Sequence, residues 1–269
     1  MLFISQLGVD GLSMSTIKSY LASIRNLLIN NGLQNISIYS PRVELVLRGI
    51  KRVKGFSAVS KVRLPITPDI LVALKKVWGS NTPDNRMFWA AACLGFFGFL
   101  RCAEFTSISV SAFDPAKHLT VGDVFVKSDK QLSSMAVRLK MSKTDQFGKG
   151  VWLHFQRTGV ALCPVEAMVD YIQLRGSKEG PLFLTSHNQP LTRSYFLVNL
   201  RNALAQAGID DSQYAGHSFR IGAATTALRA GVSDAKIKML GRWESSAYQL
   251  YLRTPRQELA SIAPILAKI

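Results

Sequence analysis

The sequence predicts a mainly α-helical protein with a small antiparallel β-sheet, an α+β fold. Most of the chain carries apolar residues at helical spacing, in segments that begin near Ser, Thr or Pro and often end at Gly. Between residues 118 and 155, three segments instead are β-branched or alternate between apolar and polar residues, and the turn TDQFGKG joins the last two. With hydrophobic residues at 48% of 269, the chain can bury a real core.

The N-terminal part predicts three helices, over residues 1–11, 13–32 and 41–55. The third has an apolar stripe, and basic residues lie largely off that stripe: Arg42, Arg48, Lys51, Arg52 and Lys54. Because no acidic residue follows Glu44 to balance them, we interpret these residues as phosphate contacts. A charged face that meets only solvent is the open alternative.

A stretch without periodicity, GFSAVSKVRL, follows and predicts a domain boundary. We therefore expect a small helical domain over residues 1–57, a linker over 58–66 and a larger domain over 67–269. In the larger domain the expected strands are 118–126, 135–143, 150–155 and a short one at 182–184. The expected helices are 67–78, 84–99, 164–175, 191–207, 217–230, 233–240 and 245–253, with a last short helix around Pro264.

The charge balance points to a polyanionic partner. Lys plus Arg number 33 against 17 Asp plus Glu, which gives a net charge of +16. Nucleic acid is the commonest partner of such a chain, although a basic surface that binds nothing stays open. A membrane surface is disfavoured, because the basic residues are spread along the chain. The longest apolar run, 87–100, is too short to span a bilayer, and we expect a soluble intracellular protein.

The three cysteines do not suggest a disulfide framework or a zinc site. Their number is odd, and Cys93, Cys102 and Cys163 form no CxxC pair. Cys93 and Cys102 stand in apolar surroundings and are expected in the core. The sequence also offers no acidic cluster that would hold a metal, so we expect no metal and no other cofactor.

Five residues contain the parts needed to cleave a phosphodiester: Arg101, Lys143, His217, Arg220 and Tyr251. Two guanidiniums match phosphate oxygens and stabilise charge in the transition state. A Tyr hydroxyl can attack, and Lys or His can protonate the leaving oxygen. The spacing of His217 and Arg220 places both on one helix face.

Each of these residues also has a structural interpretation. Arg101 follows an apolar run and could form an ion pair with Glu104, three residues later. Lys143 lies near a hairpin turn, where a lysine is usually solvated, and so does Lys140. A Tyr is more often a core residue than a nucleophile.

At these residues the sequence resembles the tyrosine recombinase, or phage integrase, family. AGHSFRIGAATTALRAGVSDAKIKMLGRWESSAYQLYLR is similar to the C-terminal part of a Cre-like catalytic domain, FLRCAEFTSI to the first Arg box, and SMAVRLKMSKTDQ to the hairpin that carries the active-site Lys. The resemblance covers residues 62–269 as a catalytic domain. Residues 1–57 resemble the last part of the helical, SAM-like core-binding domain, which is truncated here. The style of the sequence is similar to mobile-element recombinases of the Crypton or DIRS kind.

The resemblance implies a role for each site residue. Arg101 and Arg220 would bind the scissile phosphate, and His217 would assist proton transfer. Lys143, which precedes Thr as the family Lys does, would protonate the leaving 5′ oxygen in preference to Lys140. Glu104 would buttress the first Arg box.

The same comparison gives roles to the aromatic residues near the end of the chain. Trp243 would occupy the second His/Trp position and donate its indole N–H to the phosphate. Tyr251, in YLR, would be the nucleophile, and Tyr248 is its rival. The separation of Trp243 and Tyr251 is 251 − 243 = 8 residues, one shorter than the Cre-like pattern.

The family implies a site-specific recombinase that acts on double-stranded DNA through a covalent 3′-phosphotyrosine intermediate, without ATP or metal. It further implies a homotetramer on DNA, with residues 258–269 packing either on a neighbouring protomer or on their own domain. The compartment would be the nucleus in a eukaryote and the cytoplasm otherwise. Two alternatives stay open: an inactive or domesticated DNA-binding protein derived from a mobile element, and a type IB topoisomerase.

Overall fold

A computed structural model describes residues 1–33, 37–55, 63–79, 82–128, 133–142, 145, 148–245 and 248–249. The chain divides into two compact units, Met1–Lys61 and Val62–Ile269. Residues 63–66 belong to the second unit, where the N–H groups of Leu64 and Ile66 donate to the carbonyls of Gln213 and Ser218 at 3.0 and 2.9 Å. The expected helix 245–253 and the tail fall almost entirely outside the described residues.

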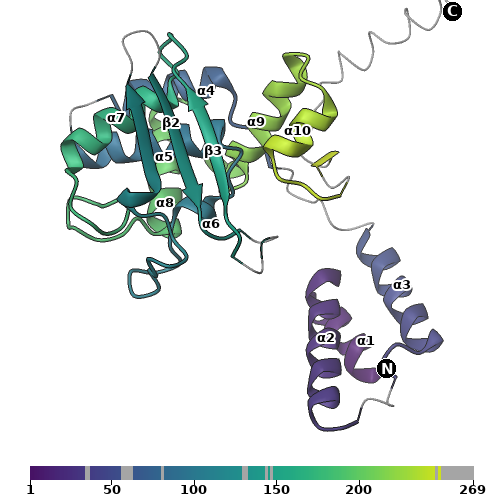
Figure 1. Ribbon diagram of the computed structural model, residues 1–269. Helices are drawn as coiled ribbons and strands as arrows, with labels where there is room; N and C mark the ends of the chain where they lie inside the picture. The colour runs from purple at the N-terminus through teal and green to yellow at the C-terminus, as the bar shows by residue number, and fades with distance from the viewer. Residues whose placement is uncertain are drawn as a thin grey trace, which may run out of the picture. The chain divides into compact units, whose positions relative to one another are not determined.

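The first unit consists of helices α1 (Leu2–Val9), α2 (Met14–Asn30) and α3 (Pro41–Gly55), as the sequence predicted (Figure 1). Ser13 caps α2, because its hydroxyl accepts the N–H of Thr16 at 3.1 Å. The core of the unit is small: Ile4, Leu7, Ile17, Leu21, Val43 and Leu47. A core of this size stabilises a domain only modestly.

The second unit is built around a buried helix, α5 (Pro83–Phe97). Its residues from Met87 to Phe96 are all buried, so its apolar composition reflects a central position, as predicted. Other helices pack around it: α4 (Pro68–Val77), α7 (Pro164–Arg175), α8 (Arg193–Gln206) and α9 (Ser218–Arg229). Helix α10 (Asp234–Leu240) packs on α9. Thr67, Thr82 and Thr192 cap α4, α5 and α8 with their side chains. No helix of the described residues is both long and apolar enough to cross a membrane.

A three-stranded antiparallel sheet lies against the helices in the order β1-β2-β3 (Figure 1). The strands are β1 (Val124–Ser128), β2 (Ser133–Leu139) and β3 (Val151–Gln156). In the register, Val124 faces Val137 and Leu139 faces Val151. The sheet therefore confirms the predicted hairpin meander and the α+β class.

Three strand predictions were wrong in detail. The second strand is Ser133–Leu139, so it ends before the expected residue 143. The first strand does not begin at His118, because the Asp123 carboxylate accepts hydrogen bonds from the N–H and the hydroxyl of Thr120, which closes a short 3₁₀ turn, Val121–Asp123. Residues 182–184 do not form a strand. Leu184 makes only an isolated bridge, with Pro190.

Close packing brings α9 against the start of the second unit. A Cβ on Gly222 of α9 would lie 1.8 Å from the carbonyl oxygen of Ile66, so only glycine permits this approach. The contact fixes the axial position of α9, which carries Arg220 into the centre of the unit.

Candidate functional site

Arg220 lies fully buried on α9 and is held from several directions. Its Nη1 donates to the carbonyl oxygen of Phe99 at 2.6 Å, and its Nη2 donates to that of Gly241. The guanidinium carbon lies 4.1 Å from the ring centroid of Trp243, a cation–π contact. The fork of Arg220 is thereby fixed in position and orientation before any ligand arrives.

Arg101 lies at the start of the short helix α6 (Cys102–Phe105), which the sequence did not predict. Its Nη1 forms the predicted ion pair with Glu104 Oε1 at 2.9 Å, and its backbone N–H donates to Glu104 Oε2, also at 2.9 Å. Glu104 is buried, whereas the Arg101 side chain keeps 15% of its surface exposed. Glu104 thus orients Arg101 without shielding it fully from solvent.

Arg242 connects these two arginines, and sequence reasoning missed it. It follows α10, and its Nη2 donates to Glu104 Oε2 at 3.1 Å and to the carbonyl oxygen of Phe99 at 3.3 Å. Its Nη1 donates to the carbonyl oxygens of Gly98 and Leu240, both at 3.1 Å. Burial lowers the pKa of the Arg242 guanidinium, and the Glu104 carboxylate opposes that shift.

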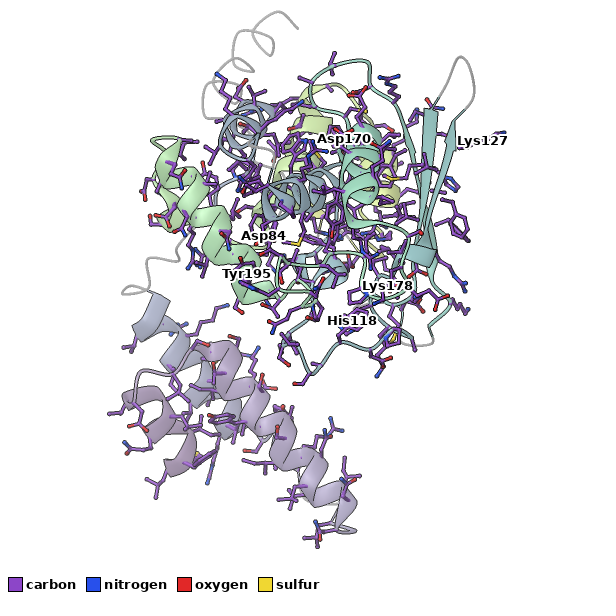
Figure 2. All side chains as sticks on the ribbon, turned by 90° about the vertical axis from the view of Figure 1, so that its left-hand side faces the viewer. Asp84, His118, Lys127, Asp170, Lys178 and Tyr195 are labelled. Carbon is purple, nitrogen blue, oxygen red and sulfur yellow. The ribbon has the colours of Figure 1, made fainter. Side chains whose placement is uncertain are left out.

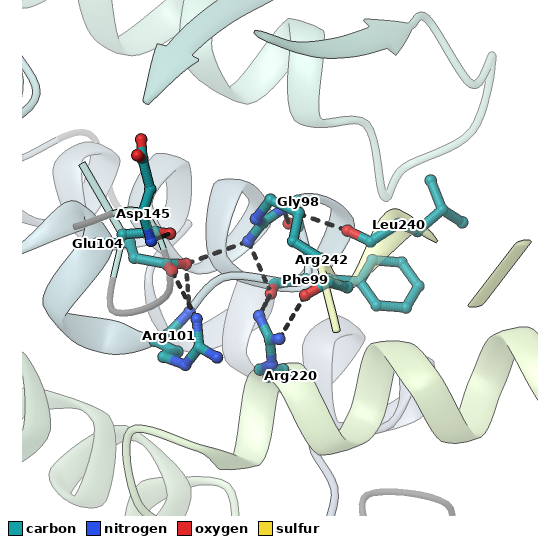
Figure 3. Close-up of polar contacts among 10 residues, drawn as sticks. Gly98, Phe99, Arg101, Glu104, Asp145, Arg220, Leu240 and Arg242 are labelled. Carbon is teal, nitrogen blue, oxygen red and sulfur yellow. Dashed lines mark hydrogen bonds and ion pairs between the residues drawn. The ribbon is translucent and has the colours of Figure 1, made fainter. Parts of the chain in front are cut away.

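A continuous chain of contacts therefore joins Arg101 to Arg220, and Figure 3 shows it in one view. The chain runs from Arg101 to Glu104, then to Arg242, and through the shared carbonyl of Phe99 to Arg220. Two guanidiniums that are 119 residues apart in sequence (220 − 101 = 119) belong to one polar network. In the described residues, Glu104, Arg242 and the Phe99 carbonyl link these two candidates.

The backbone carries strain at the same place. Phe99 has φ 51° and Arg242 has φ 56°, a left-handed conformation that is unfavourable for residues other than glycine. Such a conformation costs on the order of 1–3 kcal/mol per residue and persists only where the surroundings enforce it. Here the carbonyl of Phe99, which accepts from both Arg220 and Arg242, supplies part of that enforcement.

Trp243 is buried and covers Arg220. A Cβ on Gly241 would lie 1.6 Å from the Trp243 ring, so the glycine makes room for the indole. The ring also meets Phe99 edge-on, with centroids 6.5 Å apart. Trp243 therefore packs within the network, directly against Arg220, which is a candidate for phosphate binding.

Tyr248, the rival nucleophile, is occupied by other contacts. It is buried, its ring lies 6.1 Å from that of Trp243, and its hydroxyl donates to Asp234 Oδ2 at 2.9 Å. That hydrogen bond, helped by burial, raises the pKa of Tyr248. Tyr251, the preferred nucleophile, lies outside the described residues.

Lys140 is held in an ion pair, whereas His217 is exposed at the start of α9. Lys140 Nζ forms an ion pair with Asp123 Oδ2 at 2.6 Å and donates to the carbonyl of Pro115 at 2.8 Å, which commits it to a structural role. His217 is exposed at the N-cap position of α9, whereas Arg220, one turn later, is buried. Lys143 lies outside the described residues.

A cavity of about 530 Å³ opens beside the network. Its lining includes Ser142 and Asp145 from the turn after β2, and Arg242 and Trp243 from the segment after α10. Ser142 and Asp145, which lie on either side of residues 143–144, thus line the same cavity as Arg242 and Trp243 of the network.

The basic residues of α3 belong to the other unit and are exposed where their side chains are described: Arg42, Arg48, Lys51 and Arg52. Arg48 Nη2 lies 3.6 Å from Glu44 Oε2, a solvent-exposed pair of little energetic weight. The side chain of Lys54 lies outside the described residues. Cys93, Cys102 and Cys163 are free and buried, as expected for the first two.

Comparison with known proteins places this network in context. The curated "Integrase/recombinase xerD homolog" of Selenomonas ruminantium is 25% identical over 215 residues, which cover 76% of this chain and 57% of that protein. The chain thus spans somewhat over half the length of this relative.

Solved structures share the fold at low identity. XerH recombinase, in a post-cleavage complex with palindromic difH substrate, matches with a TM-score of 0.66 and 14% identity, over 99% of this chain and 70% of that one. The Tn1549 transposon integrase, in complex with transposon right end DNA, matches with a TM-score of 0.59 and 13% identity, over 98% and 83%. XerA recombinase matches with a TM-score of 0.52 and 16% identity, over 97% and 94%.

Residues 90–255 match the model of the "Phage integrase family", and this range spans more than half of the chain. It begins within α5 and contains Arg101, Glu104, Arg220 and Arg242. The chain therefore belongs to the phage integrase family of tyrosine recombinases.

Proposed function

We propose that this protein cleaves and rejoins double-stranded DNA at specific sites through a covalent 3′-phosphotyrosine intermediate. The observation that carries the proposal is the network that holds Arg101 and Arg220 together through Glu104 and Arg242. Two fixed guanidiniums are suited to bind one phosphodiester and to stabilise the charge of its transition state.

In this scheme the hydroxyl oxygen of Tyr251 attacks the phosphorus, and the bond from phosphorus to the 5′ oxygen breaks. His217 assists proton transfer by accepting the proton of the Tyr251 hydroxyl, and Lys143 gives a proton to the 5′ oxygen as it leaves. The 5′ hydroxyl of a partner strand then attacks the phosphotyrosine and releases Tyr251. One phosphoester replaces another at each step, so the scheme needs no ATP, and the two guanidiniums stabilise the charge that a metal would otherwise stabilise.

Two features of the described residues support these assignments. Tyr248 is buried and bonded to Asp234, which favours Tyr251 as the nucleophile. Lys140 is committed to Asp123, which favours Lys143 as the proton donor. Because Arg220 is fully buried, the scheme also requires that the residues covering its guanidinium, Trp243 among them, move when the phosphate binds.

The assembly follows from the reaction. Exchange of strands between two duplexes needs four active subunits, and we assign a homotetramer on DNA. Residues 1–57 act as part of a core-binding domain in which the basic residues of α3 contact phosphates, and residues 67–269 act as the catalytic domain. The protein acts where its DNA lies, in the nucleus of a eukaryote or the cytoplasm otherwise.

The test is covalent trapping on nicked duplexes with a randomised core, from which SDS-resistant adducts are recovered and sequenced. The wild type and Tyr248→Phe should form the adduct, whereas Tyr251→Phe should not. Peptide mass spectrometry of the wild-type adduct should find the nucleotide on Tyr251. If the wild type binds the duplexes but never forms an adduct, the protein is a DNA-binding derivative without strand-transfer activity.

A further inference from the structure

The outer face of the sheet is a second surface of interest, away from the arginine network. Met135, Val137 and Leu139 of β2 point inward and are buried, so the alternate residues of each strand form the opposite face. That face consists of Phe125, Lys127, Ser134, Ala136, Arg138, Trp152, His154 and Gln156. Figure 2 shows the sheet edge-on, with Lys127 on the side away from the helices.

An aromatic pair lies on this face. Phe125 and Trp152 keep 54% and 47% of their surfaces exposed, and their ring centroids are 5.4 Å apart at an interplanar angle of 56°. They come from the two outer strands and meet across β2, where Phe125 is opposite the small Ala136 and Trp152 is opposite Arg138. Two large rings left in solvent on a rigid sheet provide apolar contact area at little conformational cost.

The charge of this face has one sign. Lys127 and Arg138 are exposed, and His154 lies opposite Ala136 in the row of Phe125. Among the described residues that point outward from the three strands, none is Asp or Glu. In the described part of the chain, Lys127 and Arg138 form no ion pair. The face is therefore complementary to an anion that also presents flat apolar surfaces.

We propose that this face binds single-stranded nucleic acid, with unpaired bases stacked on Phe125 and Trp152 and phosphates near Lys127 and Arg138. An open sheet with aromatic and basic side chains can stack two or three bases. Ser134, His154 and Gln156 add hydrogen-bonding groups to the same face. Bases of duplex DNA cannot stack on Phe125 and Trp152, because their faces are already stacked on each other.

This surface does not depend on strand cleavage, so the two proposals can fail separately. Binding is measured with fluorescein-labelled dT12 by fluorescence anisotropy, and with a duplex of the same length for comparison. Trp152 provides a second signal, because it is exposed whereas Trp78, Trp89 and Trp243 are buried, and its share is the quenching that Trp152→Ala removes. Stacking of a base on Trp152 should quench its fluorescence.

The double variant Phe125→Ala/Trp152→Ala should weaken dT12 binding by about tenfold or more, since stacking contributes about 1–3 kcal/mol per base. Phe125→Leu, which keeps an apolar side chain, should weaken it by a smaller factor without loss of folding. Arg138→Gln should weaken dT12 binding and reduce its salt dependence. Arg201→Gln, a matched exposed arginine on α8, should leave dT12 binding within twofold of wild type.

Duplex affinity should stay within twofold of wild type in the aromatic variants. The proposal is wrong if the double variant binds dT12 as tightly as wild type, or if dT12 does not quench Trp152. It is equally wrong if a polyglutamate peptide quenches Trp152 as strongly as dT12, because the face would then recognise negative charge alone.

Discussion

Replacing Arg242 by Met should destabilise the second unit strongly. The side chain is 13% exposed, and its guanidinium donates to three carbonyl oxygens and to Glu104. Loss of one partner from a buried ion pair costs about 3–5 kcal/mol, because the remaining charge stays buried. Arg101 still pairs with Glu104 in the variant, which places the expected loss near the lower limit, at about 3 kcal/mol.

Urea unfolding monitored by circular dichroism measures this loss. Arg201→Met, at an exposed position on α8, is the matched control and should change the free energy of unfolding by less than about 0.5 kcal/mol. In a double-mutant cycle, Arg242→Met combined with Glu104→Gln should cost less than the sum of the two single changes, because the carboxylate no longer needs a cation. A loss below about 1 kcal/mol for Arg242→Met would refute the view that this residue holds the network together.

Three further outcomes are expected. Gly241→Ala should lower the free energy of unfolding by about 1–3 kcal/mol in the same urea assay, because its Cβ would overlap the Trp243 ring; an unchanged midpoint would contradict that packing. Lys140→Met should cost about 3–5 kcal/mol, since it leaves the buried Asp123 carboxylate without its cation, and Lys140→Met/Asp123→Asn should recover part of the loss. Burial raises the pKa of the Cys102 thiol to about 11 from its ordinary value of 9.0. The folded protein therefore loses stability as the pH rises from 9 towards 11, and at pH 8 its Cys102 thiolate fraction is about 100-fold lower than in urea. Iodoacetamide labelling of Cys102 at pH 8 should accordingly be slow until urea is added, and equal labelling rates would contradict the burial.

Local signals explain what the sequence predicted well. Helices α4 and α5 each begin with a Thr cap followed by Pro, and these signals depend only on neighbours in the chain. The strand pattern located the sheet but misplaced the start of β1. There the carboxylate of Asp123 closes a turn on Thr120, and a short polar side chain outweighed the β-branched pattern around it.

The candidate site divides in the same way. Arg101 and Arg220 were predicted because each stands in a distinctive local setting, and the structure joins them. Arg242 had no such setting, because its main partner, Glu104, lies 138 residues earlier in the chain. The contact between Arg242 and Glu104 depends on how the end of α10 packs against the turn after α5, and no local sequence pattern predicts that packing.

The shared carbonyl of Phe99 has a consequence for protein synthesis. Phe99 leaves the ribosome before either arginine whose hydrogen bonds it accepts, so its left-handed conformation lacks that part of its enforcement until both have emerged. A nascent chain that ends before Gly241 lacks one acceptor of Arg220 and the whole of Arg242. Arg101 and Arg220 can therefore be joined through this network only after Gly241 and Arg242 have been made. A polypeptide that ends before Gly241 carries Arg101 and Arg220 without the contacts that join them.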